Sequence, residues 1–316
     1  MSAVTDRGSD TPTHRKKKTG LSDRARSEQH LGWRLAMPAF VIMLLVTAYP
    51  ILQAIWNSFF YYRLTDPDNR EFVGLQNYLV SFTDEVFWKA MWMTVLVTVI
   101  TVVVELVFGF IIALVMHRIV IPRRTLRTVV LIPYSIITVV SGFTWLYAFR
   151  TDTGFVNNWI NWIPGIDPNY DWFGSFWPSV FVISLSEIWK TTPFMSLLLL
   201  AGLAQVDSSM EEAAKVDGAS WIQVLVKVIL PSMKAAVMVA LLFRTLDAFR
   251  IFDNIFIMTG GANDTASLSM LIYRQTIDRT EIGLGSALSV ILFLCVLVIA
   301  AVFVKLFKVD LAEGRS

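Results

Sequence analysis

The sequence contains little of what most enzymes use for chemistry. Cys295 is the only cysteine, so no disulfide can form within the chain. The three histidines are scattered and show no His-Glu-x-x-His or comparable metal spacing, and no Walker A sequence is present to hold a nucleotide. No pairing of a nucleophile with a base is recognisable either. We therefore expect a protein that is not an enzyme, with no metal site and no cofactor bound by this chain.

Charged residues are also scarce. They make up 16% of the chain, against about 25% in a typical soluble domain, whereas hydrophobic residues make up 55%. An apolar run of about 20 residues is long enough to cross a bilayer as a helix. Several such runs predict an all-α membrane protein with six transmembrane helices in one domain, 31–316. The runs are 34–59, 91–116, 127–149, 178–203, 234–258 and 284–307.

Residues 1–30 are polar and include the basic run Arg15–Lys18, which predicts a disordered tail. The basic run could bind anionic lipid or nucleic acid, but a role in membrane orientation is the simpler interpretation. We therefore expect membrane lipid, and no nucleic acid, as a partner. With the N-terminus inside, the inner segments hold 18 Lys and Arg residues and the outer segments hold 6. Because positive charge marks the cytoplasmic side, both termini and the loop 204–233 are predicted to face the cytoplasm.

The loop 204–233 is a polar break between the fourth and fifth apolar runs. We predict a short helix over about 209–217, ending at Gly218, because glycine tolerates the left-handed conformation that often ends a helix. Ser220 can cap a second helix, and Pro231 ends it. Small side chains would let another surface approach this backbone closely; they belong to Ala213, Ala214 and Ala219.

The residues at the start of the short helix are typical of a helix N-terminus. Asp207, Ser208 and Ser209 carry side-chain oxygens that can accept hydrogen bonds from free backbone N–H groups. Glu211 or Glu212 lies three residues beyond a serine, which is the spacing of a capping box. An ordinary connector between two helices would also show these features.

The full spacing of the loop is more specific. Glu-Ala-Ala is followed three residues later by Asp-Gly-Ala and then by Leu230-Pro231. This resembles the EAA loop of the membrane subunits of bacterial ABC importers, in which a short coupling helix sits in a groove of the ATP-binding subunit. The resemblance implies a type I importer permease in the bacterial inner membrane, coupled through Glu212–Pro231. The residues that it assigns to coupling are Glu212, Ala213, Ala214, Asp217, Gly218 and Ala219.

Three other segments resemble the sugar-permease branch of this family. They are Phe72–Tyr78, Trp189–Met195 and Phe243–Asn254, of which the last two are similar to segments of trehalose permeases. The resemblance implies a neutral disaccharide such as trehalose as the substrate. It also implies four partners: a second permease, two ATP-binding subunits that hold ATP and Mg, and an extracytoplasmic substrate-binding lipoprotein.

Charged residues inside the apolar runs are the other candidate for function. A central Arg, Lys or Asp costs about 2.5–3.5 kcal/mol on insertion scales, so such residues must face a partner or a wet cavity. Their signed sum is −1, which suits a neutral solute better than a phosphorylated one. Structural Arg–Asp pairs that hold helices together are the alternative. The seven residues are Glu105, Glu187, Lys190, Arg244, Asp247, Arg250 and Asp253.

The spacing of these charges gives further expectations. Glu187 and Lys190 can meet on one helix face, and Pro193 is expected to break or bend that helix near mid-membrane. The charges of the fifth run recur every three residues, so they either wind around the helix or the helix tightens locally. In related sugar permeases the sugar is held by the span before the EAA loop and by the span after it. This resemblance and the charges within the apolar runs together predict the substrate pathway. Its residues are Glu187, Trp189, Lys190, Thr191, Phe194, Arg244, Asp247 and Arg250.

A proton- or sodium-coupled carrier is the rival hypothesis. Glu105, Glu187 and Asp247 would then form the ion relay. This reading accounts for the buried charges but not for the cytoplasmic loop, and the sequence shows no obvious inverted repeat. A requirement for ATP, as opposed to an ion gradient, distinguishes the two.

Overall fold

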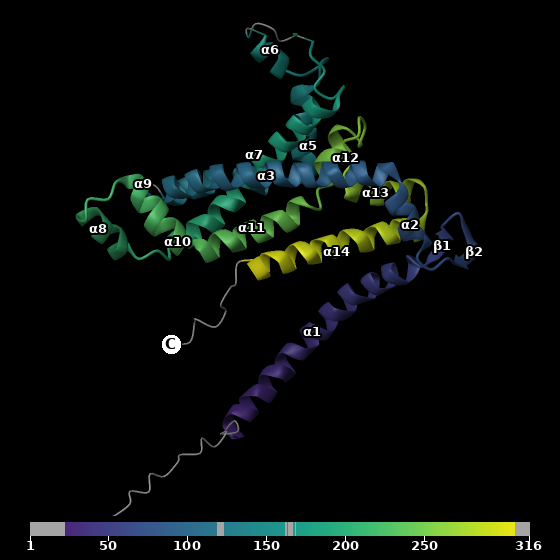
Figure 1. Ribbon diagram of the computed structural model, residues 1–316, viewed down its shortest axis with the longest axis horizontal. Coiled ribbons are helices and arrows are strands. Elements are labelled where there is room, and N and C mark those ends of the chain that lie inside the picture. The colour runs from purple at the N-terminus through teal and green to yellow at the C-terminus, as the bar shows by residue number, and fades with distance from the viewer. Residues whose placement is uncertain (1–22, 119–122, 162, 164–166, 168, 307–316) are drawn as a thin grey trace, which may run out of the picture. The chain divides into compact units, whose positions relative to one another are not determined.

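The structure, a computed structural model, describes residues 23–118, 123–161, 163, 167 and 169–306. This part of the chain consists of helices and one antiparallel hairpin (Figure 1). The elements are α1 Asp23–Asn57, β1 Phe60–Arg63, β2 Asp66–Phe72, α2 Gln76–Thr83, α3 Glu85–Arg118, α4 Arg123–Ser135, α5 Thr138–Phe149, α6 Val156–Ile160, α7 Phe176–Leu203, α8 Ser208–Val216, α9 Trp221–Val224, the π-helix η1 Leu225–Ile229, α10 Leu230–Ser232, α11 Lys234–Ala248, α12 Asp253–Met258, α13 Leu268–Tyr273, the π-helix η2 Arg274–Asp278 and α14 Ile282–Leu306.

The chain divides into two units, Met1–Gln53 and Ala54–Ser316. In the first unit, α1 begins at Asp23, so the end of the predicted disordered tail is helical instead. Residues 1–22 lie outside the described part of the chain, and disorder there stays a prediction.

Three helical stretches are long and apolar enough to cross a membrane: Leu31–Asn57, Glu85–Arg118 and Ile282–Lys305. Three bent helix pairs raise the number to as many as six among the described residues. The bends are 82° between α4 and α5, 73° between α7 and α8, and 70° between Trp221–Ser232 and Lys234–Met258. Each predicted apolar run overlaps one of these six. Pro133 precedes the 82° bend, where its missing N–H and its ring interrupt regular helix.

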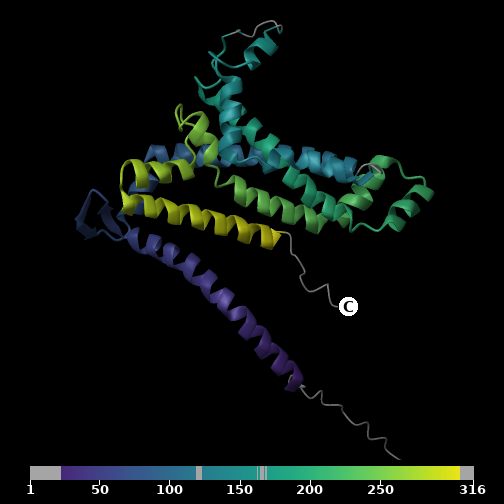
Figure 2. The ribbon, with the colours of Figure 1, turned by 180° about the vertical axis from the view of Figure 1, so that it is seen from behind.

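The centre of the second unit is formed by α3 and α7, with α11 packed against both and α14 beside α11 (Figures 1 and 2). Gly109 on α3 permits this packing, because a Cβ there would lie only 2.8 Å from Met195 Cγ and 3.2 Å from the backbone N of Ser196. Glu105 lies one turn earlier on the same face of α3. The close approach of the two helices therefore brings the Glu105 side chain against α7, with no exposed surface.

Pro193 does not break its helix, contrary to one of the two predicted effects. α7 continues through Pro193 as a single helix from Phe176 to Leu203. Hydroxyl groups around the proline donate to carbonyls of the same helix: Thr192 to Ile188 O at 2.6 Å and Ser196 to Pro193 O at 2.7 Å. Neither acceptor is Trp189 O, the carbonyl that would accept from residue 193 in a regular helix, so the helix continues without these bonds replacing the lost one.

The fifth predicted run, 234–258, is not one helix. α11 ends at Ala248 and α12 begins at Asp253. At the end of α11 the backbone tightens towards three residues per turn, which was one of the two alternatives for this run. Arg250 N donates to Asp247 O and Ile251 N to Ala248 O, both at 3.1 Å. The helix then stops. This break separates the charges of the run into two on α11 and two at or beyond its end.

Candidate functional site

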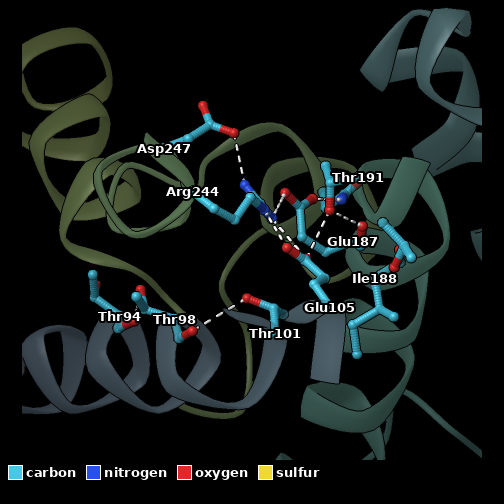
Figure 3. A network of polar contacts seen from close by, with 11 residues as sticks. Thr94, Thr98, Thr101, Glu105, Glu187, Ile188, Thr191, Arg244 and Asp247 are labelled. Carbon is cyan, nitrogen blue, oxygen red and sulfur yellow. Dashed lines mark hydrogen bonds and ion pairs between the residues drawn. The ribbon is translucent and has the colours of Figure 1, made fainter. Parts of the chain in front are cut away.

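Arg244 on α11 is the centre of a buried charge network (Figure 3). Its side chain is 1% exposed and donates to three carboxylates. Nε and Nη2 both donate to Glu105 on α3, the latter over 2.9 Å. Nη2 also donates to Glu187 Oε1 on α7 at 2.8 Å, and Nη1 to Asp247 Oδ2 at 2.6 Å. One guanidinium thus ties α3, α7 and α11 together.

Two further side chains complete this network. Thr191 donates to Glu105 Oε1 at 2.7 Å, and Asn254 Nδ2 donates to Glu187 Oε2 at 2.7 Å. Both oxygens of Glu105 and both oxygens of Glu187 therefore have a donor. The four carboxylate oxygens thus have the donors that buried charges require. Gly142 on α5 leaves room for Asn254, since a Cβ there would lie 3.3 Å from Asn254 Oδ1, which is buried and accepts no hydrogen bond from the described residues.

Two sequence-based expectations about pairing are wrong. Glu187 points to Arg244 and Asn254 and forms no ion pair with Lys190 among the described residues. Arg250 likewise has no carboxylate within 4.0 Å in that part of the chain; its Nε donates to Leu246 O at 3.1 Å. Of the two Arg–Asp pairs in the structural alternative, one is present, Arg244 with Asp247, and Arg244 also bonds to Glu105 and Glu187.

A cavity of about 410 Å³ lies beside the network. Five of the eight predicted pathway residues line it: Glu187, Lys190, Thr191, Asp247 and Arg250. The other lining residues are Tyr134, Thr138, Ile251, Phe252, Asp253 and Asn254. The sixth pathway residue, Arg244, lies buried behind this wall and reaches the cavity only through its acidic partners.

Some lining groups are free to bind a ligand. Lys190 Nζ lies 5.6 Å from the centre of the Tyr134 ring and has no hydrogen-bond acceptor among the described residues. Asp247 uses one oxygen for Arg244, and its side chain is 65% exposed. Together with the guanidinium of Arg250, these groups offer both donors and an acceptor. Glu187 and Thr191 are instead engaged in the network.

Two aromatic residues line the cavity, Tyr134 and Phe252, and neither was predicted as a pathway residue. Phe194 stacks on Tyr134, with ring centres 5.3 Å apart and an angle of 14° between the rings. Trp189 packs edge-on against Trp145 at 5.9 Å and is 41% exposed. Trp189 and Phe194 are therefore not part of the cavity wall, and their contact with a substrate stays a prediction.

Asn254 is another residue that was not predicted, whereas Glu105 was predicted both as one of the charges that need a partner and as part of an ion relay. Glu105 carried a signal, because a carboxylate within the apolar run 91–116 needs a partner. The sequence carried no such signal for Asn254, because its contact with Glu187 depends on the break after α11, which places Asn254 against α7.

The loop 204–233 has most of the predicted local structure. α8 spans Ser208–Val216, and Asp207 accepts from the backbone N–H of Ser209 at 2.9 Å, which holds the pKa of Asp207 below its usual range. Gly218 has φ +80°, the left-handed conformation predicted for it. The capping box, however, lies at Ser220 and Gln223, at the start of α9. At α8 the aspartate occupies the N-cap, so no serine is available there to pair with a glutamate.

α8 has no buried residue among its nine. Met210 is 49% exposed and Val216 87% exposed, so both ends of the helix present apolar surface. Glu212 and Ala213 are exposed as well, as are Asp217 and Gly218. Ala214 and Ala219 pack partly against the cluster formed by α3, α7 and α9–α11.

The second helix of the loop connects α8 to the membrane helices. The Trp221 ring lies 5.4 Å from the guanidinium carbon of Arg118 at the end of α3. Val224 and Met233 pack with Leu203 at the end of α7. The π-helix η1 precedes Pro231, where a wider turn accommodates the proline ring and its missing N–H. α8 is therefore joined to α3 and α7 through packed contacts.

The described residues contain no group of three His, Cys, Asp or Glu side chains placed to hold a metal ion. The cavity of about 410 Å³ thus lies next to a buried ion network.

Comparison with known proteins agrees with this geometry. Residues 105–309 match the family model described as "Binding-protein-dependent transport system inner membrane component". The chain is 46% identical over 289 residues to the trehalose transport system permease protein SugA of Mycobacterium tuberculosis, with 92% of each chain covered. It is 35% identical to the trehalose/maltose transport system permease protein MalF of Thermococcus litoralis, over 88% of this chain and 94% of that one.

Among solved structures, a bacterial alginate ABC transporter in complex with an alginate pentasaccharide-bound periplasmic protein has the same fold. Its matching chain superposes with a TM-score of 0.74 at 20% identity, covering 93% of this chain and 98% of that one. The family model covers more than half of this sequence, and the relatives are similar over nearly its whole length. The chain therefore belongs to the family of binding-protein-dependent transport system inner membrane components, the permeases of ABC importers.

Proposed function

We propose that this permease carries a neutral disaccharide such as trehalose, and that the cavity beside Arg244 is its half of the sugar pathway. The observation that carries the proposal is the set of free groups in that cavity: Lys190 Nζ, the Arg250 guanidinium and one oxygen of Asp247. A sugar hydroxyl can accept from the two cations and donate to the carboxylate. Tyr134 supplies a ring face on which the apolar face of a sugar can pack.

The charge balance of the site supports a neutral substrate. Arg244, Lys190 and Arg250 carry three positive charges. The network and the cavity wall carry four negative ones, from Glu105, Glu187, Asp247 and Asp253. A pathway for a phosphorylated solute should be positive, because like charges repel strongly where water is scarce. The similarity to two permeases named for trehalose transport favours trehalose among neutral disaccharides.

The chain is the non-enzymatic membrane subunit of its transport system, so hydrolysis of ATP belongs to other subunits. In the proposed assembly a second permease forms the other half of the pathway. Two ATP-binding subunits hold ATP and Mg on the cytoplasmic side, and a substrate-binding lipoprotein delivers the sugar outside. This chain itself binds no cofactor in the proposal. Both of its termini face the cytoplasm, in line with the excess of Lys and Arg in the inner segments.

Coupling to the ATP-binding subunit is proposed to occur through α8 and the turn after it. A nine-residue helix with no buried residue and two exposed apolar ends is stable only when it packs on something else. Glu212, Ala213, Asp217 and Gly218 lie on the exposed part of this segment, whereas Ala214 and Ala219 seat it on the membrane helices.

The rival ion-coupled mechanism is not favoured. A relay carboxylate must release its partner to take up a proton or sodium ion. Glu105 and Glu187 have every oxygen bonded to Arg244, Thr191 or Asn254, which leaves only Asp247 free to act. We therefore propose transport driven by ATP.

Transport in sealed proteoliposomes tests this function. The full importer, reconstituted with its binding protein outside and ATP inside, should accumulate labelled trehalose. Accumulation should persist when ionophores collapse the proton and sodium gradients, and should stop without ATP. Uptake driven by an ion gradient in the absence of ATP would overturn the proposal.

The variant Gly218→Val probes coupling in the same vesicles. A β-branched residue at φ +80° is strained, although a Cβ there meets no atom within 4 Å, so the turn after α8 must change while the membrane helices keep their packing. ATP hydrolysis should continue while trehalose uptake falls at least tenfold. Gly260→Val, at another open position with φ +56°, is the matched control and should keep the two rates in proportion. Normal coupling in Gly218→Val would exclude this turn from the ATPase contact.

The proposed orientation can be tested by labelling single cysteines in a Cys295→Ala background. A membrane-impermeant thiol reagent applied to intact cells should react with a cysteine at position 264, where Asp264 is exposed. It should react with a cysteine at position 209 only after permeabilisation. The reverse pattern would place α8 outside the cell and remove it from any ATP-binding subunit.

A further inference from the structure

A second cavity, of about 450 Å³, lies at the hairpin end of the unit Ala54–Ser316. It is formed by β1, β2, α2 and the start of α14, and its volume lies within the range of about 300–1,000 Å³ typical of small-molecule pockets. None of its residues belongs to the pathway beside Arg244. The lining residues are Tyr61, Tyr62, Arg63, Glu71, Val73, Gln76, Asn77, Val80, Glu281 and Leu284.

One wall of this cavity holds a hydrogen-bond acceptor in a fixed position. Asn77 is 9% exposed, and its amide nitrogen donates to Ser58 O at 2.8 Å and to Phe60 O at 2.9 Å. Both amide hydrogens are thus used by the backbone of the hairpin. The carbonyl oxygen of the same side chain has no donor among the described residues, so it is available to a ligand.

Arg63 also lines the cavity, and one of its nitrogens lacks a partner. Arg63 pairs with Glu281 through a backbone bridge and through Nη2 and Oε1, which are 3.4 Å apart. Its Nε is buried and has no hydrogen-bond acceptor among the described residues, so this atom presents no surface to a ligand in the cavity.

This wall is held rigidly. A Cβ at Gly283 would lie 2.1 Å from Phe60 O, so α14 begins in direct contact with β1. Thr280, just before α14, has φ +56°, a conformation that is strained for a β-branched residue. Leu64 N donates to Thr280 O at 2.9 Å and fixes this segment to the hairpin. Local strain of this kind accompanies sites that hold a ligand in a defined geometry.

The chemistry of the lining selects the class of ligand. Arg63 is opposed by Glu71 and Glu281, so the lining is negative overall and disfavours a phosphate or carboxylate group. The side chain of Gln76 adds a neutral donor and acceptor, that of Asn77 adds an acceptor, and two tyrosines add apolar ring faces. Hydroxyl groups, which both donate and accept, match this lining better than an anionic group.

We propose that this cavity is a second binding site, for a neutral polyhydroxylated ligand, distinct from the central pathway. Its expected occupant is the transported sugar, held on the outer side of the membrane before it enters the cavity beside Arg244. The outer location and the identity of the sugar rest on the function proposed above. The polyol class rests on the lining residues alone.

Photolabelling of the assembled importer tests the site. The complete complex in lipid nanodiscs, without its external binding protein, is exposed to a trehalose derivative that carries a diazirine, and labelled peptides are identified by mass spectrometry. We expect label in the segment 61–80 and near Glu281, and at least a tenfold loss of that label when unlabelled trehalose is present in excess.

Two variants locate the label within the cavity. Val80→Trp fills the cavity from α2, where Val80 is 46% exposed, and should reduce labelling of the segment 61–80 at least tenfold. Leu79→Trp is the matched control, because Leu79 is 64% exposed and does not line the cavity; it should leave labelling unchanged.

The outcomes separate this site from the central pathway. Label confined to peptides around Lys190 and Asp247 would overturn the outer site while leaving the proposed pathway intact. Label in the segment 61–80 without central label would support the outer site and count against the pathway. Label that unlabelled trehalose does not displace, or a phospholipid retained there in its place, would overturn the proposal.

Discussion

Arg244→Met should prevent assembly of the permease. The substitution keeps a long side chain but leaves Glu105, Glu187 and Asp247 without their shared cation. Removal of one partner of a buried ion pair costs about 3–5 kcal/mol, and here two of the three abandoned carboxylates are almost fully buried. That cost is a large fraction of the stability of a typical domain, about 5–15 kcal/mol. We expect little or no assembled complex by size-exclusion chromatography.

Arg250→Met is the matched control for this experiment. It removes the same group six residues later, from a side chain that is exposed and has no carboxylate within 4.0 Å among the described residues. The yield of assembled complex should be normal, and uptake should fall if Arg250 contacts the sugar. Normal yield of Arg244→Met would show that water reaches the network and compensates the three carboxylates.

The contrast between these two arginines shows where sequence reasoning stopped. The free-energy cost of placing a charge in a membrane helix predicts that charges within apolar runs need partners. This cost is the same for Arg244 and Arg250, so it does not show which of the two has partners. The partner of Arg244 is Glu105, 139 residues away, and the contact depends on the close approach of α3 to α7 at Gly109. No local pattern specifies which pair of helices meets. α11 ends at Ala248, so Arg250 lies outside the helix, and the sequence of the apolar run 234–258 did not indicate this end.

Local features were predicted much better. The end of α8 at Gly218 and the cap at Ser220 follow from the backbone preferences of single residues, and both are confirmed. The apolar runs follow from composition over about 20 residues, the length that a bilayer requires. The aromatic wall of the cavity was predicted wrongly, because it depends on how helices bend and pack and not on the preferences of single residues. Tyr134 faces the cavity because α4 and α5 bend by 82°, whereas Phe194 stacks behind it on an unbroken helix.

Asp247→Asn should abolish most transport while assembly stays normal. The structure removes the ambiguity of this substitution, because Arg244 keeps Glu105 and Glu187 when Asp247 loses its charge. The side chain of Asp247 is 65% exposed toward the cavity, so an amide there leaves no buried charge unpaired. A hydrogen bond to a charged group contributes about 1.5–3 kcal/mol, and about 1.4 kcal/mol is a factor of ten in affinity. Trehalose uptake by the reconstituted importer should therefore fall at least tenfold.

Asp264→Asn is the control for the charge change. Asp264 is 61% exposed and pairs with Lys89 at 3.2 Å, and exposed pairs of this kind contribute about 0–1 kcal/mol. Its yield and uptake should match those of the unmodified importer. Poor yield of Asp247→Asn alone would make Asp247 a part of the structural network, because the loss would then arise before any sugar binds. Normal yield with normal uptake would remove Asp247 from the sugar pathway, and the cavity would need Lys190 and Arg250 to bind the sugar without an acceptor.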